Sequence, residues 1–145
     1  MRGAFSTEAE TVDPFDLEKV KSANRAYYAA LSARDLAAMQ HVWSRAASDV
    51  NIAPPACAVA HTGWNAIKKN YEVLWPTLGE MNVSMANPEI VIRGSVAWVY
   101  GIENVTRKVK NGHPTVIQNF GTGIFVNEAG HWLMVFHQAS PISSA

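Results

Sequence analysis

The sequence predicts an α+β domain in which three N-terminal helices cover one face of an antiparallel sheet. Three long segments near the C-terminus have strand character: 95–109, 115–126 and 131–139. An Asn111-Gly112 pair separates the first two, and this dipeptide is the strongest short-range hairpin signal. The first half of the chain instead shows helical periodicity. Helices grouped before antiparallel strands are typical of α+β folds.

The first helix is expected to begin at Asp13-Pro14, because an aspartate cap followed by proline at the first helical position is a strong start signal. Its inward stripe recurs at steps of three and four residues. That stripe consists of Leu17, Val20, Asn24, Tyr27 and Leu31. We therefore expect residues 1–12 to be a flexible arm and residues 13–145 to form one domain.

Two more helices are expected before the sheet. Asp35 is a suitable cap for the second, whose apolar face includes Trp43. Residues 48–53 alternate like a short strand. The third helix is expected to open at Thr62-Gly63 and to stop at Pro76. A strand within 81–93 then leads into the long sheet.

The charge balance and cysteine content exclude several classes of partner. The chain has 145 residues, with 12 basic and 12 acidic side chains, so no basic footprint for nucleic acid or for an acidic membrane is present. One cysteine, Cys57, excludes an internal disulfide framework and fits a reducing compartment. No segment has the length of a membrane span, and residues 1–10 lack a secretory signal's apolar core. We therefore expect a cytoplasmic protein.

Four motifs carry a resemblance to a known family: 27–36, 61–71, 94–101 and 123–137. Their order and spacing resemble those of the SnoaL-like branch of the superfamily that includes ketosteroid isomerase and nuclear transport factor 2. The resemblance implies a cone-shaped, strongly curved antiparallel sheet packed on three N-terminal helices, the cystatin-like α+β roll. It also implies an internal pocket and a homodimer formed through the outer face of the sheet.

The resemblance implies two classes of function, because members of this family include enzymes and non-catalytic modules. The first is a protein that binds a small, neutral, partly hydrophobic molecule in an apolar pocket, as an isomerase, cyclase or dehydratase using proton transfer. The alternative is a non-catalytic dimerising association domain resembling that of calcium/calmodulin-dependent kinase II. No cofactor is expected, since there is no glycine-rich phosphate loop.

Period-two alternation proposes which strand residues line the pocket. By analogy with the family, the expected cavity face of the last two strands carries Leu133, Val135, His137, Phe120, Thr122 and Ile124. The helices, the short strand and the loop add further walls. The candidate ligand-binding residues are Asn24, Trp43, Asn51, His61, Trp64, Phe120, Thr122 and Val135.

Tyr27 and His137 are the candidate catalytic residues. Tyr27 matches the place on the first helix where ketosteroid isomerases carry a tyrosine that donates a hydrogen bond to the developing enolate. The two acids of those enzymes would fall at Pro54 and near Thr122, so both are absent here. His137 is then the best remaining acid or base near neutral pH. A core tyrosine and a structural histidine are the alternatives.

Other titratable residues give weaker signals. Glu103 is the only acid inside the long strands that precede the last turn. It faces either the cavity or the dimer interface. Cys57 and His61 are four residues apart, which suggests a reactive thiolate or a half-buried thiol. No metal is expected, because His131 and His137 lie on the order of 20 Å apart along one strand.

The aromatic residues of the sheet also predict its outer face. Trp98, Tyr100 and Trp132 are expected to stack across neighbouring strands opposite the pocket. Exposed aromatic patches of this kind are typical of dimer interfaces. We therefore expect a homodimer.

Overall fold

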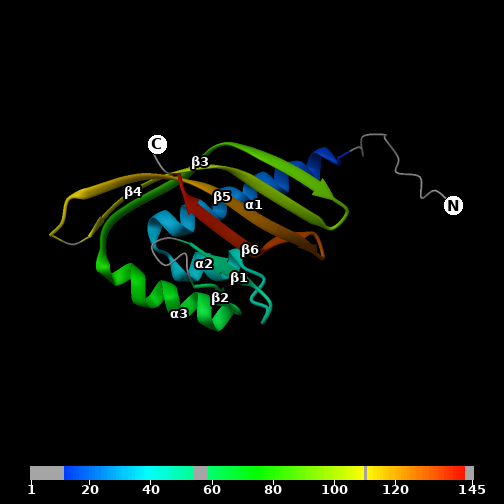
Figure 1. Ribbon diagram of the computed structural model, residues 1–145. Coiled ribbons are helices and arrows are strands. Elements are labelled where there is room, and N and C mark those ends of the chain that lie inside the picture. The colour runs from blue at the N-terminus through cyan, green and yellow to red at the C-terminus, as the bar shows by residue number, and fades with distance from the viewer. Residues whose placement is uncertain (1–11, 54–58, 110, 143–145) are drawn as a thin grey trace.

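The computed structural model describes residues 12–53, 59–109 and 111–142. Within these ranges the chain forms three α-helices, a short 3₁₀-helix and six strands (Figure 1). The elements are α1 Pro14–Ala33, α2 Leu36–Val42, β1 Val50–Ile52, β2 His61–Thr62, α3 Trp64–Leu74, η1 Trp75–Thr77, β3 Leu78–Arg93, β4 Val96–Val109, β5 Pro114–Glu128 and β6 His131–Pro141. Residues 1–11 of the expected arm, as well as Pro54 and Cys57, lie outside the described residues.

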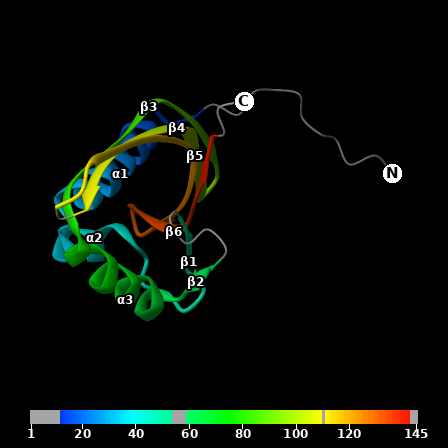
Figure 2. The ribbon, with the colours of Figure 1, turned by 60° about the vertical axis from the view of Figure 1, so that its left-hand side comes forward.

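The six strands form one sheet in the order β2-β1-β6-β5-β4-β3. Figure 2 shows the sheet curling without closing, with the helices on its inner side. The prediction of an α+β fold with a strongly curved sheet is confirmed. The sheet is mixed, because β1 runs parallel to β6 while the other pairs are antiparallel.

The helix boundaries follow from the capping residues. The Asp13 side chain accepts a hydrogen bond from the Phe15 amide at 2.8 Å, which starts α1 at Pro14. Arg34 adopts a left-handed conformation with φ of 52° and ends α1. Asp35 then accepts from the Ala38 amide at 3.0 Å and caps α2. Both predicted helix starts are confirmed.

The hydrophobic core lies between α1 and the inner face of the sheet. Residues at the predicted three- and four-residue spacing of α1 are buried there, including Val20 and Tyr27. The sheet contributes Val99 from β4 and Phe125 from β5, both fully buried. Because α1 is held against the sheet along its length, its polar side chains Asn24 and Tyr28 are buried as well.

The prediction that Phe120, Thr122 and Ile124 face the cavity is wrong. Phe120 is 62% exposed, whereas Asn119 and Phe125 of the same strand are buried on the inner face. The glycines of β5 explain the error, since small residues fill the inner face where larger neighbours need room. A Cβ atom on Gly123 would lie 3.2 Å from the Phe125 ring and 3.3 Å from Met134.

A β-bulge changes which side of β6 faces inward. Ile124 pairs with Phe136 and Phe125 pairs with Met134, so Val135 is an extra residue in β6. Before the bulge Trp132 and Met134 are buried, and after it His137 is buried. The sequence prediction put His137 on a common inner face with Leu133 and Val135. The prediction of an inward orientation is wrong for Leu133 and Val135, because simple alternation ignores the bulge.

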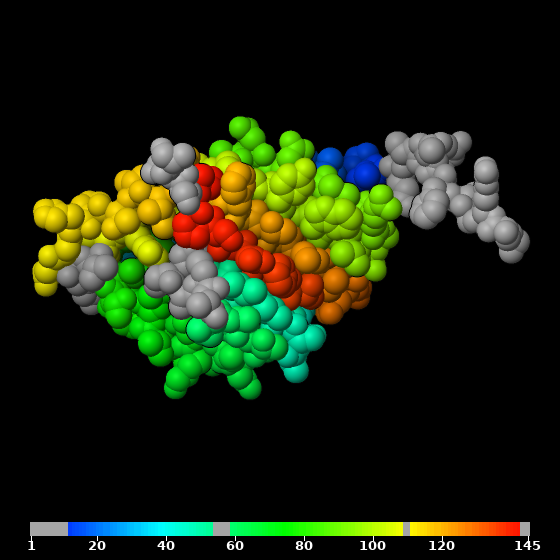
Figure 3. Space-filling view, in the orientation of Figure 1, coloured from blue at the N-terminus to red at the C-terminus, as the bar shows by residue number. Residues whose placement is uncertain are grey.

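The outer face of the sheet carries Tyr100, which is 46% exposed, and the exposed Phe120. In Figure 3, β5 and β6 lie on the surface that faces the viewer. The prediction that Trp132 lies on this outer face is wrong. Its side chain is buried, and its indole donates a hydrogen bond to Asp16 of α1 at 3.4 Å. None of the helices in the described part of the chain has the length and apolarity that a bilayer span requires.

Candidate functional site

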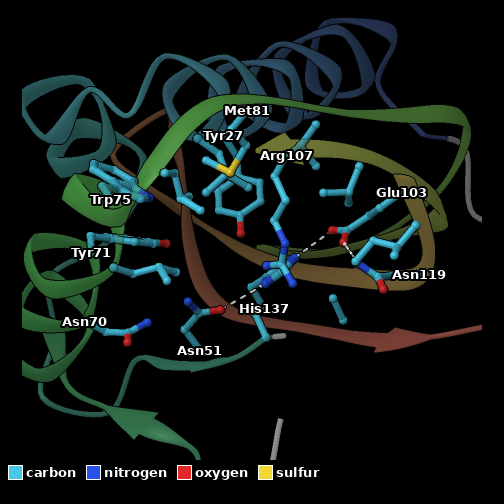
Figure 4. Close-up of a pocket in the computed structure, with 18 residues that line it drawn as sticks. Tyr27, Asn51, Asn70, Tyr71, Trp75, Met81, Glu103, Arg107, Asn119 and His137 are labelled. Carbon is cyan, nitrogen blue, oxygen red and sulfur yellow. Dashed lines mark hydrogen bonds and ion pairs between the residues drawn. The ribbon is translucent and has the colours of Figure 1, made fainter. Parts of the chain in front are cut away.

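A cavity of about 70 Å³ lies between α1, α3 and the inner face of the sheet. Most of its wall is apolar, and a group of polar side chains is concentrated on the sheet side (Figure 4). The polar lining residues are Tyr27, Asn51, Asn70, Tyr71, Glu103, Arg107, Asn119 and His137, together with the indole of Trp75. An apolar cavity with a few convergent polar groups is the usual form of a small-molecule site.

Glu103 is the centre of the polar group. Its Oε2 accepts hydrogen bonds from the Tyr28 hydroxyl at 2.6 Å and lies 2.9 Å from Nε2 of His137. Its Oε1 accepts from the Asn119 side-chain amide at 3.3 Å. Glu103 as a residue is 3% exposed, so these three groups take the place of water around its carboxylate.

These partners keep Glu103 charged. Burial by itself would raise the pKa of this carboxyl group, because removal from water disfavours the ionised form. The hydrogen bond and the charge of His137, with the donors of Tyr28 and Asn119, outweigh burial and hold the Glu103 pKa below its ordinary value. Glu103 is therefore a fixed negative charge at neutral pH.

His137 is held from both ring nitrogens. Nδ1 lies 2.9 Å from Oδ1 of Asn51, and Nε2 faces Glu103. With an oxygen at each nitrogen, the arrangement is that of an imidazolium that donates to both; a half-turn of the Asn51 amide would suit the neutral ring. The Tyr27 ring packs on the imidazole with a centroid distance of 4.7 Å. Both ring nitrogens therefore have partners within the protein.

Gly121 makes room for this arrangement. A Cβ atom at Gly121 would lie 2.5 Å from Oε2 of Glu103, closer than side-chain atoms approach one another. The Glu103 side chain therefore crosses the sheet surface through the space that a larger residue would fill. The glycine is required here for a close approach, since its own φ is not in the left-handed region.

Two tyrosine hydroxyls point into the cavity, those of Tyr27 and Tyr71 (Figure 4). Burial raises the pKa of Tyr27 well above its ordinary value, and nearby Tyr71 and Glu103 raise it further. Burial also raises the pKa of Tyr71, although the Trp43 indole and the Tyr27 hydroxyl face its oxygen and act in the opposite direction. The Tyr71 hydroxyl has no hydrogen-bond partner within the described residues. Both groups are therefore neutral donors.

The cavity brings together three of the predicted site residues: Tyr27, Asn51 and His137. Asn24 instead lies in a separate groove between α1 and β3, where its side chain contacts the sulfur of Met85 at 3.9 Å. The other predicted ligand-binding residues do not line the cavity. Trp43 is in the core, Trp64 packs beside the core, His61 is in β2, Val135 is in the bulge, and Phe120 and Thr122 are on the outer side of β5.

Sequence reasoning missed Tyr28, Asn119 and Arg107, and left Glu103 open between two faces. A signal for Glu103 was available in its own strand, where Val99 and Val105 share its parity and are buried with it. Gly121 was a second signal, because a glycine within a long strand often marks close approach of another group. In the parts of the chain described here, no group of three or more His, Cys, Asp or Glu could hold a metal ion.

The chain belongs to the SnoaL-like domain family. The family model matches residues 20–144, which include the whole cavity and every strand up to the C-terminus of β6. A comparison with curated protein sequences finds no match.

Solved structures with the same fold have low sequence identity to this chain. A dehydratase candidate of the NTF2-like family from Streptomyces avermitilis is 18% identical, with a TM-score of 0.81 over 91% of this chain and 100% of its own. A ketosteroid isomerase-like protein from Erwinia carotovora atroseptica is 21% identical, with a TM-score of 0.77 over 91% and 100%. The CaMKII hub homology domain of Chlamydomonas reinhardtii is 21% identical, with a TM-score of 0.72 over 88% and 99%.

Proposed function

We propose that this chain is a cofactor-free enzyme that moves a proton on a small, partly apolar molecule, as a dehydratase or isomerase does. The observation that carries the proposal is the buried pair of His137 and Glu103, 2.9 Å apart, in a cavity into which the Tyr27 hydroxyl points. A histidine oriented by a carboxylate is a common general acid and base. Similarity in fold to a dehydratase candidate and to a ketosteroid isomerase-like protein supports the same class.

In this mechanism His137 takes a proton from a carbon next to a carbonyl group, and its positive charge is stabilised by Glu103. Tyr27 donates a hydrogen bond to the carbonyl oxygen as negative charge develops there. His137 then returns the proton, either to another carbon or to a departing hydroxide that leaves as water. Glu103 holds Nε2 of the ring through both steps, while the Asn51 amide must leave Nδ1 so that this nitrogen can take and return the proton.

The test is proton exchange with solvent, which needs no knowledge of the complete reaction. The protein is incubated in deuterium oxide with a panel of small ketones, aldehydes and β-hydroxy carbonyl compounds, and loss of the acidic C–H signals is followed by proton NMR. We expect exchange faster than in buffer, and its loss in His137→Ala and Tyr27→Phe. Thr122→Ala, on the outer side of β5, is the matched control and should exchange at the wild-type rate.

Two results would reject this function. One is a panel in which no compound exchanges faster than in buffer. The other is an unchanged rate in His137→Ala, because the proton must then move through another group.

An association module is a second candidate, and the outer face of the sheet favours it. Phe120 and Tyr100 are 62% and 46% exposed there, on adjacent strands. The fold is also that of CaMKII hub domains. A homodimer through this face is compatible with catalysis, so the exchange test separates an enzyme that dimerises from a module that only associates.

Cytoplasmic localisation is part of the proposal, and the single cysteine supports it.

A further inference from the structure

We propose that the cavity binds a small organic carboxylate, held by the guanidinium of Arg107 and the hydroxyl of Tyr71. The inference rests on the proposed function in treating this cavity as the active site, and it adds the chemical class of the substrate. The balanced charge of the whole chain favoured a neutral ligand, but the charge inside the cavity is a separate property.

Arg107 is the first observation. Among the described residues that line the cavity it is the only arginine or lysine, and Figure 4 shows its side chain reaching into the cavity. It shares a strand face with Glu103, four residues away, which places the two backbones about 13 Å apart along β4. No ion pair or hydrogen bond joins Arg107 to any acid in the described part of the chain.

The charges around the cavity leave that of Arg107 uncompensated. Glu103 is the only acid of the described lining, and it already has His137, Tyr28 and Asn119 as partners. The Glu103 carboxylate is enclosed by these three partners, so it does not pair with the guanidinium. A half-buried guanidinium without a counter-ion is costly, and a carboxylate fits its two parallel N–H groups. The cavity is therefore complementary to an anion.

Tyr71 is the second observation and is independent of Arg107. Its side chain is 3% exposed, its hydroxyl has no hydrogen-bond partner in the described residues, and Figure 4 shows it pointing into the cavity. The Trp43 indole and the Tyr27 hydroxyl face this oxygen without reaching hydrogen-bond geometry, so its proton is available to a ligand oxygen. Because this hydroxyl keeps its proton, it is a donor for an anionic oxygen.

The size of the cavity limits the ligand. A cavity of about 150 Å³ is large enough to bind benzene, whereas this one has about 70 Å³. Only a few atoms can be enclosed, so part of a ligand such as butyrate must extend past the half-buried Arg107 toward solvent. We therefore assign the site to short-chain carboxylates.

The test compares butyrate with butyramide, which have nearly the same shape and differ in charge. Isothermal titration calorimetry measures both with the wild-type protein at low ionic strength. We expect butyrate to bind about 10- to 100-fold more tightly than butyramide, since hydrogen bonds to charged groups are of that strength. Added salt should reduce this preference.

Three variants test which residues cause the preference for butyrate over butyramide. Arg107→Gln should remove it, and Arg107→Lys, which keeps the charge without the planar fork, should retain part of it. Tyr71→Phe should weaken the binding of butyrate by about 10-fold and have little effect on the binding of butyramide. Circular dichroism of each variant establishes that it is folded before its binding is compared.

The outcomes separate this inference from the proposed function. Tyr27→Phe should abolish proton exchange and keep the preference for butyrate, because it changes no charge in the cavity. If wild-type protein shows that preference without exchange, the carboxylate site stands and the catalytic proposal fails. Equal binding of the two compounds, no binding of butyrate, or an unchanged preference in Arg107→Gln would overturn the inference.

Discussion

The Tyr28 hydroxyl and the Glu103 carboxylate are joined by a 2.6 Å hydrogen bond that links α1 to β4 across 75 residues of sequence. Tyr28 also lines the groove between α1 and β3. The helix therefore supplies two adjacent residues to one site: Tyr27 lines the cavity, and Tyr28 donates to the carboxylate. The position of α1 and the charge of Glu103 depend on each other.

Tyr28→Phe should destabilise the protein by about 1–3 kcal/mol, because it removes a donor from a buried charged acceptor. The free energy of unfolding by urea at neutral pH measures the effect. Tyr100→Phe is the matched control, since Tyr100 is 46% exposed on the outer face and should change stability little. Equal effects of the two substitutions would mean that the Tyr28 hydroxyl does not support Glu103.

Acid should lower the free energy of unfolding by protonating Glu103. Its pKa is lower in the folded state than its ordinary value of 4.5, so the unfolded chain takes up a proton first as pH falls. The contribution of Glu103 is fully present above about pH 4.5 and is lost as pH falls through the folded pKa. Urea unfolding across this range should show a shallower loss in Glu103→Gln than in wild type. Glu80→Gln, at an exposed position of β3, should keep the wild-type slope.

Gly121→Ala should disturb the site although glycine-to-alanine changes in strands often stabilise. The added Cβ atom would meet Oε2 of Glu103 at 2.5 Å, so the carboxylate must move away from His137 or the strand must shift. Overpacking of this kind costs about 1–3 kcal/mol, and proton exchange should fall with it. Gly94→Ala is not a suitable control, because Gly94 has a φ of 57°; Thr122→Ala on the outer side serves instead. Wild-type stability and exchange in Gly121→Ala would contradict the close approach seen here.

Alkaline titration should count the buried tyrosines. The chain has 4 tyrosines, and burial raises the pKa of Tyr27, Tyr28 and Tyr71 above the ordinary value of 10.0. Tyrosinate absorbance at about pH 11 should therefore stay well below that of the urea-unfolded chain. Circular dichroism at the same pH is the control for folding. A full signal of all four phenolates in a folded protein would show that these hydroxyls are not protected donors.

The proposed dimer depends on the outer face of the sheet. Phe120→Asp places a charge at the centre of that face and should convert a dimer to a monomer in sedimentation equilibrium. Val73→Asp is the control, because Val73 is 63% exposed on α3, away from the sheet's outer face. A monomeric wild-type protein would reject the dimer.

The order of helices and strands could be predicted because caps and turn residues act locally. Asp13, Asp35 and the Asn111-Gly112 turn each set a boundary without reference to the rest of the chain. Tyr27 and His137 could be proposed from a family resemblance together with alternation. Their shared site is formed by side chains on α1, β4, β5 and β6, and no local pattern encodes that meeting.

The inner face of the sheet could not be predicted for a different reason. Alternation assumes that large apolar residues point inward, yet the inner side of β5 carries Asn119 and Gly121. These residues are small or polar because the Glu103 side chain occupies the space beside them. The choice depends on a side chain of the neighbouring strand, so it cannot be found within β5 alone.

The extra residue at Val135 divides β6 into two parts with separate tasks. Trp132 and Met134 are buried in the hydrophobic core, while His137 lines the cavity. A chain with one residue more or fewer at this point would present a different set of side chains to the cavity while the residues in the core stay in place. In this fold, the side chains that line the cavity can change through the length of β6 as well as through substitution.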